Sequence, residues 1–286
     1  MENDSALPVP AVEKSTLDED DLPREFFRAI GYRLLEITRT VRGVGAFTLI
    51  TMGVAVTKFN VASHVIHPLI RHQIYRSGLR LMPMISFLAF ALGFVVIGQT
   101  VSLLSRVGAE HFTGTIMVTV VVRELGPLVA ALLVLARIGT ATVVELGTAR
   151  ATGEVEALEA LGIDPIHYLV LPRVVGLALS IFSLTVYLIL GALLSGYLFA
   201  FLNDIPLRPS DYFRQLALAL TWQDFVLLGL KTGCFGIIIA IVSSYQGLAR
   251  ALRLEEVSSV TTRAVVNSVV ACVLLDALFI VVYLVI

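Results

Sequence analysis

Long and nearly uncharged apolar stretches constrain this chain of 286 residues more than any other feature. Five of them reach or exceed the roughly 20 residues that a helix needs to cross a bilayer. Hydrophobic residues make up 57% of the chain and charged residues 15%, which is more apolar sequence than a soluble single-core domain uses. The chain is therefore predicted to be an all-α integral membrane protein with five transmembrane helices, at about residues 81–104, 116–138, 172–202, 225–245 and 264–286.

The first 80 residues divide into two predicted regions. Residues 1–21 are rich in acids and poor in large apolar side chains, which predicts a disordered tail. Within residues 22–80, apolar side chains recur at helical spacing from Arg24 to Val41 with arginines among them, which is typical of an amphipathic helix lying on the membrane surface. The run Val44 to Thr57 is apolar for only about 14 residues, and we expect it to be too short to span.

Basic residues predict the orientation of the spans. Ten of the 21 Lys and Arg residues precede residue 81. Three more lie in or at the ends of the loop between the second and third spans, and three in the loop between the fourth and fifth. These two loops are on the same side of the membrane as the N-terminus. The positive-inside rule therefore places the N-terminus in the cytoplasm and the C-terminus outside it. No signal peptide is predicted, because the first apolar run comes late and no cleavage site follows it.

The sequence also excludes several classes of protein. It has no phosphate-binding loop of the form GxxxxGK[ST], and no GxSxG, HExxH or SxxK motif, so no catalytic residues are predicted. The histidines His64, His67 and His72 lack carboxylates or thiolates at ligand spacing, which argues against a metal site. Cys234 and Cys272 fall inside predicted spans, where cysteine behaves as a small hydrophobic residue. Nothing indicates a nucleic-acid partner.

A charged helix is predicted between the second and third spans, within residues 144–173. Val155, Leu158 and Leu161 form one apolar stripe, while Glu154, Glu156 and Glu159 occupy mainly the other faces. Gly162 and the pair Asp164-Pro165 are signals for the end of a helix. Spacing alone allows this helix either to dock a cytoplasmic partner or to pack on the ends of its own spans.

One segment of the sequence resembles that of a known protein family. Residues 123–175 read RELGPLVAALLVLARIGTATVVELGTARATGEVEALEALGIDPIHYLVLPRVV. This segment resembles the central signature of the MlaE/YrbE family, the permease subunits of ABC transporters that work with MCE-domain lipid-binding proteins. The resemblance extends from about Arg71 to Asp276.

The resemblance implies an assembly. It implies a homodimeric permease in the bacterial inner membrane, with an ATPase dimer bound below and an oligomer of MCE proteins on the periplasmic face. The helix from about Gly153 to Leu161 would couple to the ATPase, which would bind ATP and Mg²⁺, and this chain would hold no cofactor of its own. The usual cargo is phospholipid moved between the inner and outer membranes, which supports outer-membrane lipid asymmetry. Relatives handle sterols or other hydrophobic compounds.

Two departures from the family pattern affect the expected ATPase contact. Gly153 stands where an acidic residue is expected, which predicts a weaker first turn and the loss of a charge favourable to the helix dipole. LRLEEVSSV, Leu252 to Val260, replaces a glycine-rich run before the last span.

Four charged residues fall well inside predicted spans, away from their cytoplasmic ends, where an unpaired charge is costly. On the predicted topology, all four lie roughly 10 to 15 Å below the outer surface, at 1.5 Å per residue. We expect Lys231 to pair with Asp276, and Arg123 and Glu124 to lie beside a lipid cavity because Pro127 can break their helix. The alternative is that these charges only join spans together. The predicted polar layer is Arg123, Glu124, Lys231 and Asp276.

Two other classes remain open from sequence. An ion-coupled secondary transporter would also place charges in its spans, although no inverted repeat is apparent. A scaffold that only anchors MCE proteins would bind partners without responding to nucleotide. Gly229 and Gly233 form a GxxxG pair that permits close helix approach, but such pairs are frequent in apolar sequence and we assign it no function.

Overall fold

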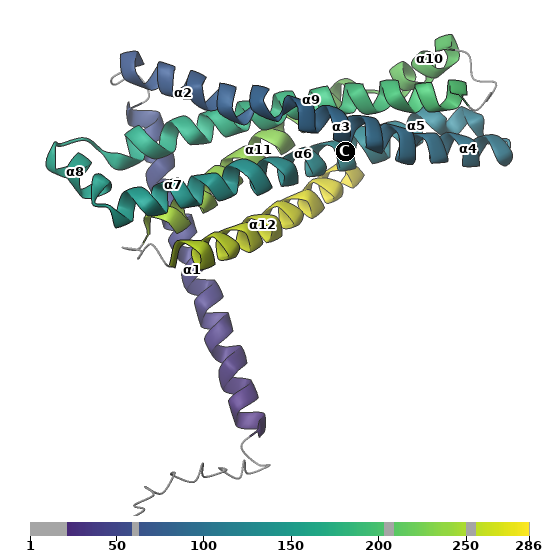
Figure 1. Ribbon diagram of the computed structural model, residues 1–286. Helices are drawn as coiled ribbons and strands as arrows, with labels where there is room; N and C mark the ends of the chain where they lie inside the picture. Colours follow the sequence, from purple (N-terminus) through teal and green to yellow (C-terminus); the bar gives the residue numbers. More distant parts are fainter. Residues whose placement is uncertain (1–21, 59–62, 203–208, 250–255, 286) are drawn as a thin grey trace, which may run out of the picture. The chain divides into compact units, whose positions relative to one another are not determined.

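The structure is a computed structural model that describes residues 22–58, 63–202, 209–249 and 256–285. Every regular element in these residues is a helix (Figure 1). Six helices in them are long and apolar enough to cross a membrane, and the five windows predicted from sequence fall almost entirely within five of these. The predicted N-terminal tail lies outside the described residues.

Helix α1 corrects one prediction. It runs without interruption from Leu22 to Lys58, so the apolar run that we judged too short is the second half of a long helix. Its segment Thr38–Thr57 has 20 residues and a mean hydropathy of 1.4, enough by length and composition to span. The sequence argument failed because it counted only the uninterrupted apolar residues. The chain forms two compact units that meet within α1, between Ala46 and Phe47.

The described part of residues 47–286 contains long helical rods, and the first three of them are each built from several segments. Short π-helical stretches, in which a backbone N–H bonds to the carbonyl five residues back, widen the rods without ending them. The first rod consists of α2 (Ser63–Ser77), η1 (Leu79–Leu81), α3 (Met82–Leu92), η2 (Gly93–Ile97) and α4 (Gly98–Arg106). The second consists of α5 (Thr113–Met117), η4 (Val118–Leu125), α6 (Gly126–Val134), η5 (Leu135–Gly139) and α7 (Thr140–Ala151), and η3 (Glu110–Phe112) precedes it.

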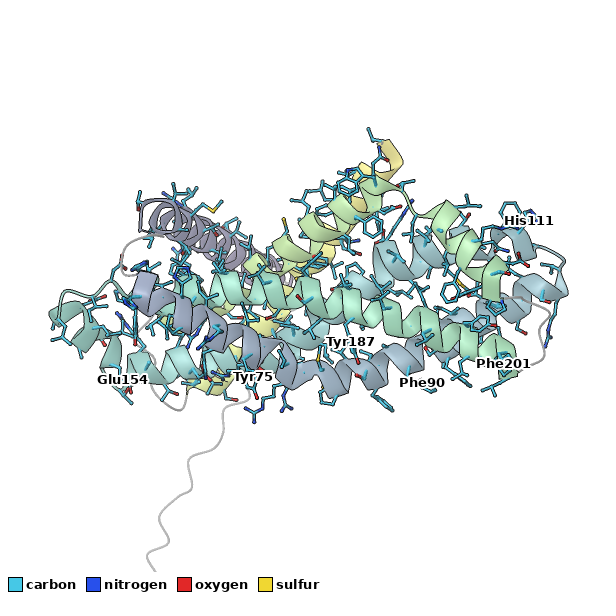
Figure 2. All side chains as sticks on the ribbon, turned by 90° about the horizontal axis from the view of Figure 1, so that it is seen from above. Tyr75, Phe90, His111, Glu154, Tyr187 and Phe201 are labelled. Atoms are coloured by element: carbon cyan, nitrogen blue, oxygen red, sulfur yellow. The ribbon has the colours of Figure 1, made fainter. Side chains whose placement is uncertain are left out.

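The remaining elements complete this unit. The short helix α8 (Glu154–Ala160) connects the second rod to the third, which consists of η6 (Ile166–Val170) and α9 (Leu171–Leu202). Helix α10 (Pro209–Ala219) follows, and the last two rods are α11 (Trp222–Leu248) and α12 (Val257–Val285). Figure 1 shows α8 at one end of the bundle and α10 at the other, and Figure 2 shows Glu154 and His111 at these opposite ends.

Helix α9 lies at the centre of the packing, against α2, α3, α6 and α11. Apolar side chains from α3, α6, α9 and α11 meet in one core, which includes Ile85 of α3, Ile181 of α9 and Phe235 of α11, all fully buried. At the end marked by α10, the buried Tyr212 donates a hydrogen bond to the carbonyl of Leu193 at 2.9 Å. Burial raises the pKa of this tyrosine above its usual range.

Small residues determine how closely α9 and α11 approach. A Cβ added to Gly236 would lie 2.4 Å from the Cα of Ala178, so α11 and α9 pack backbone to backbone there. A Cβ at Gly233 would meet nothing within 4 Å, and one at Gly229 would meet only Phe182. The GxxxG pair noted in the sequence therefore makes no close approach within the described part of this chain, and a different glycine does.

This difference yields a prediction with a matched control. Gly236→Ala should destabilise the protein by about 1–3 kcal/mol, because a methyl group there forces the two helices apart. Gly233→Ala, three residues earlier on the same helix, should leave stability unchanged or slightly raised. Thermal unfolding of both variants in detergent measures the difference, and equal melting temperatures would contradict the packing described for α9 and α11.

Candidate functional site

Lys231 is the centre of a charged cluster within the apolar rods. Its side chain is fully buried in α11, and its ammonium donates a hydrogen bond to Glu124 Oε2 at 2.8 Å. The same nitrogen lies 2.7 Å from Asp276 Oδ1 of α12, in an ion pair that lacks hydrogen-bond alignment. The contact between Lys231 and Asp276 that depth predicted is therefore present, but Glu124 shares the same ammonium.

A backbone carbonyl provides the third contact of Lys231. Its ammonium donates to the carbonyl oxygen of Arg123 at 2.9 Å. Arg123 lies four residues before Pro127, and proline has no N–H to donate to the carbonyl four residues back. The lysine thus satisfies an oxygen that the proline leaves without its usual α-helical partner.

The prediction that Pro127 breaks its helix is wrong. The helix continues through Pro127, which is buried near the start of α6. The eight π-helical residues of η4 come directly before α6, and the N–H of Gly126 donates to the carbonyl of Val121, five residues back. The wider turn accommodates the proline ring where a regular α-helix would clash with it.

Arg123 makes contacts that the sequence analysis missed. Its Nε lies 2.7 Å from Asp224 Oδ1, and Nη2 donates to Asp224 Oδ2 at 3.3 Å. Its guanidinium also lies over the ring of Tyr283, 5.2 Å from the ring centre. Asp224 Oδ2 in turn accepts hydrogen bonds from the backbone N–H and the hydroxyl of Thr221, at 2.8 and 2.9 Å. A signal for Asp224 was available, since Thr221 and Asp224 have the spacing of a capping box at the start of α11.

The cluster therefore contains five charged side chains rather than four. Two cations face three carboxylates, so its formal charge is −1 when all are ionised. Lys231 and Asp224 are almost completely buried, whereas the side chains of Arg123 and Glu124 are 27% and 28% exposed. One side of the cluster is therefore closed, and the other is partly exposed.

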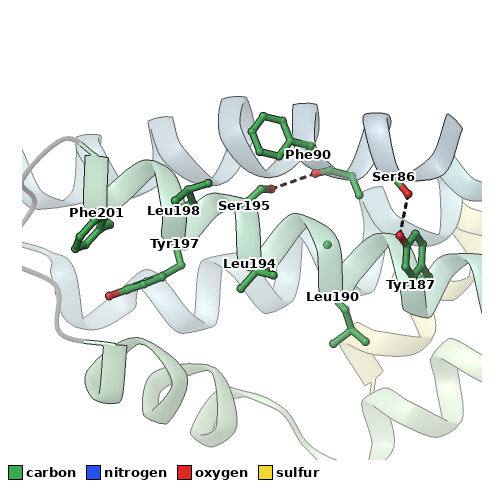
Figure 3. A pocket seen from close by; sticks show the side chains of 11 residues that line it. Ser86, Phe90, Tyr187, Leu190, Leu194, Ser195, Tyr197, Leu198 and Phe201 are labelled. Carbon is green, nitrogen blue, oxygen red and sulfur yellow. Dashed lines mark hydrogen bonds between the residues drawn. The ribbon is translucent and has the colours of Figure 1, made fainter. Parts of the chain in front are cut away.

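Two apolar grooves flank α9. The larger, of about 830 Å³, lies between α3 and α9, and Phe90, Leu194 and Phe201 line it (Figure 3). Its polar features are few: Ser86 and Tyr187 share a hydrogen bond of 2.8 Å, and Ser195 donates to the carbonyl of Ala89. The smaller, of about 430 Å³, lies mainly between α9 and α11, and Asp224 is its charged residue. Arg123 and Glu124 line neither groove.

Helix α8 occupies the position predicted for the coupling helix, but its start differs from the prediction. Gly153 precedes the helix with φ +80°, a conformation that glycine adopts without strain and an acidic residue does not. Glu154 and Glu156 then occupy the first turn, so the helix dipole keeps its favourable charges. Gly153 thus makes the turn between α7 and α8 possible, and the expected weakening of the first turn is wrong.

The end of α8 follows the prediction. Gly162 has φ +76°, its N–H donates to the carbonyl of Glu159, and Ile163 donates to the carbonyl of Leu158. This pair of bonds is a Schellman motif.

The apolar stripe of α8 is divided between two environments. Val155 is 2% exposed and packs on the chain itself, Leu158 is half-buried, and Leu161 is 76% exposed. Glu154, Glu156 and Glu159 are exposed, and Glu156 also pairs with Arg150 of α7 at 3.2 Å. One side of α8 therefore packs on the chain itself, and the other side is exposed, so docking of a partner there stays a prediction.

The segment Leu252 to Val260, which departs from the family pattern, is only partly described. Residues 252–255 lie outside the described part, and Val257 begins α12. In the described residues no group of three His, Cys, Asp or Glu side chains is arranged to hold a metal ion.

Comparison with known proteins decides the family. The sequence profile of the family described as Permease MlaE matches residues 70–282, which include all five charged residues of the cluster. The chain belongs to the MlaE permease family. It is thus a multi-pass membrane protein, the permease subunit of an ABC transporter, and it implies a separate ATPase partner.

Several relatives of this MlaE-family chain are described individually. A probable ABC transporter permease protein of Rickettsia felis is 31% identical over 84% of this chain and 90% of its own length. Another probable ABC transporter permease protein, from Synechocystis, is 38% identical over 57% of this chain and 62% of its own. The chloroplastic protein TRIGALACTOSYLDIACYLGLYCEROL 1 of Arabidopsis thaliana is 30% identical over 71% of this chain and 58% of its own.

Proposed function

We propose that this chain moves phospholipid between the bacterial inner and outer membranes, as a homodimer with an ATPase dimer and a periplasmic MCE-domain oligomer. The observation that carries the proposal is the charged cluster around Lys231, set among apolar rods beside a groove that can accept acyl chains. The name of the Arabidopsis relative contains a diacylglycerol lipid, which supports a lipid cargo in this family.

The two sides of the cluster suit two tasks. Lys231 holds η4, α11 and α12 together through Glu124, Asp276 and a backbone carbonyl, and it is closed to ligand. Arg123 and Glu124 are partly exposed and of opposite charge, so they can contact the phosphate and the amine of a zwitterionic head group. We propose that the head group binds there.

The apolar grooves suit the acyl chains. Leu190 of α9 lines both grooves, so a continuous apolar surface extends from Asp224 around α9 to Phe90. A lipid with its head group at Arg123 could lay its tails on this surface without crossing another charged residue of the cluster.

The proposed cycle connects this site to ATP. In the orientation that the basic residues predict, α8 faces the cytoplasm and α10 the periplasm. Closure of the ATPase dimer would press on the free side of α8, and the second and third rods, which α8 joins, would carry that movement to the cluster. The lipid would then pass to the MCE oligomer.

Co-purification followed by lipid mass spectrometry tests the proposal. The chain is tagged at one end and isolated with untagged partners, with and without ATP. We expect an ATPase, an MCE protein and bound phospholipid whose amount changes with ATP. Bound sterol or another hydrophobic compound in place of phospholipid would show that the cargo is not phospholipid. An amount of bound lipid that does not change with ATP would favour a scaffold. A chain isolated without lipid or ATPase would refute the proposal.

A further inference from the structure

A second charged site lies between the first two rods, on the side of the bundle where α8 is found. Arg76, Arg80 and Arg137 line a pocket of about 190 Å³ together with Leu81 and Ile138. A second pocket, of about 350 Å³, adjoins it through Arg76 and Arg80, and Tyr75 contributes to its wall. We call the two together the arginine pocket. Figure 2 shows Tyr75 in the half of the bundle that contains Glu154.

The charges of the arginine pocket are not balanced. Glu145 of α7 is the carboxylate that lines it, and Glu145 pairs with both Arg76 and Arg173. Within the described residues, neither Arg80 nor Arg137 has a carboxylate within ion-pair distance, and both are exposed. The pocket therefore presents two guanidinium groups without a counter-ion among the described residues, and the apolar side chains of Leu81 and Ile138 line it beside them.

The surface changes character at this level. Before Arg80, the exposed residues of the first rod include Arg71, His72 and Tyr75, whereas after it they include Met82 and Phe87, which is 75% exposed. A helix that changes from basic and aromatic to apolar is leaving the head-group region for the acyl chains. Arg137 of the second rod is about 13 residues from Glu124, which is roughly 20 Å along a helix. The arginine pocket and the Lys231 cluster thus lie at separate depths.

We propose that the arginine pocket binds the phosphate of an acidic membrane lipid in the cytoplasmic leaflet. Guanidinium groups bind phosphate oxygens through paired hydrogen bonds, and basic pockets between membrane helices select acidic head groups. The apolar residues that follow Arg80 give the acyl chains of such a lipid a surface, which a soluble phosphate would not use. The assignment of leaflet rests on the orientation in the proposed function, whereas the preference for acidic lipid does not.

Native mass spectrometry of the purified full-length chain tests this inference. The chain is titrated in detergent with phosphatidylglycerol, and separately with phosphatidylcholine as the neutral counterpart. Replacing both Arg80 and Arg137 with glutamine should weaken phosphatidylglycerol binding about thirtyfold, the size expected from two basic side chains at an anionic surface. Phosphatidylcholine binding should not change. Arg106→Gln, an exposed arginine at the far end of the same rod, is the matched control and should bind like the parent chain.

Two further arms separate the alternatives. The double replacement of Arg80 and Arg137 with lysine keeps both charges but not the paired hydrogen bonds, so its phosphatidylglycerol binding should fall less than that of the glutamine variant. Unchanged phosphatidylcholine binding by the glutamine variant shows that it lost a site rather than its fold. Inorganic phosphate added in excess should not displace the lipid; displacement would show that the pocket serves a soluble anion. Equal phosphatidylglycerol binding by the parent and the glutamine variant would overturn the inference.

This experiment is independent of transport. It uses the permease chain alone, so a failure of the proposed phospholipid cycle leaves the binding result unaffected. Conversely, if the arginine pocket binds no acidic lipid, the proposed function is unaffected, because ATP-dependent lipid release is measured in a separate experiment.

Discussion

Replacing Lys231 with methionine is expected to abolish lipid transfer and to destabilise the chain by about 3–5 kcal/mol. Methionine has a similar length but no charge, so Glu124 and Asp276 would remain as carboxylates without their shared cation, and the carbonyl of Arg123 would lose its donor. Reconstituted transfer assays measure the first effect, and thermal unfolding in detergent measures the second.

A triple variant separates the structural from the functional part of this effect. Lys231→Met combined with Glu124→Gln and Asp276→Asn removes the stranded charges, so we expect it to recover much of the lost stability while transfer stays low. Full recovery of transfer would mean that these three charges only hold the helices together. A simple exchange of Lys231 and Asp276 is a poorer test of their pairing, because Glu124 would then face a second carboxylate at position 231.

The second large effect is expected at α8. Leu161→Asp should weaken binding of the ATPase subunit about thirtyfold, because it places a charge on an apolar side chain that is 76% exposed and free to enter a partner's pocket. The permease itself should remain folded, since Leu161 lies outside the core. The amount of ATPase that co-purifies with the tagged chain measures the change.

Leu218→Asp is the matched control for that variant. Leu218 is 79% exposed on α10, at the opposite end of the bundle. Its substitution should leave ATPase binding intact. If both variants retain the ATPase equally, then α8 is not the coupling element, and its role would be limited to the inward packing of Val155.

Depth along the spans was sufficient to predict part of the site. Counting residues from the ends of the apolar windows placed Lys231 and Asp276 at one level, and the structure brings them within 2.7 Å. The count could not show that Glu124 would share the same ammonium, because the direction of a side chain around a helix depends on the π-helical stretch before Pro127. No periodicity in the sequence predicted that stretch.

Other misses have equally local causes. Asp224 lies one residue outside the predicted span at residues 225–245, so a count of charges within the spans does not include it. The interpretation of Gly153 failed because it assumed helical geometry at that residue, whereas φ +80° places it before the helix. The candidate span Thr38–Thr57 begins with residues 38–43, which include Arg39 and Arg42. A count of uninterrupted apolar residues leaves these six out and makes the span look too short.

ATP-dependent phospholipid transfer in proteoliposomes tests the central claim most directly. The vesicles contain this chain, its ATPase and the proposed MCE partner, and the measured quantity is labelled phospholipid moved to the MCE protein. We predict that the lipid moves when ATP is hydrolysed, stays when a non-hydrolysable analogue replaces ATP, and stays in the Lys231→Met variant. Transfer that proceeds at the same rate without ATP, or that an ion gradient drives, would contradict the account.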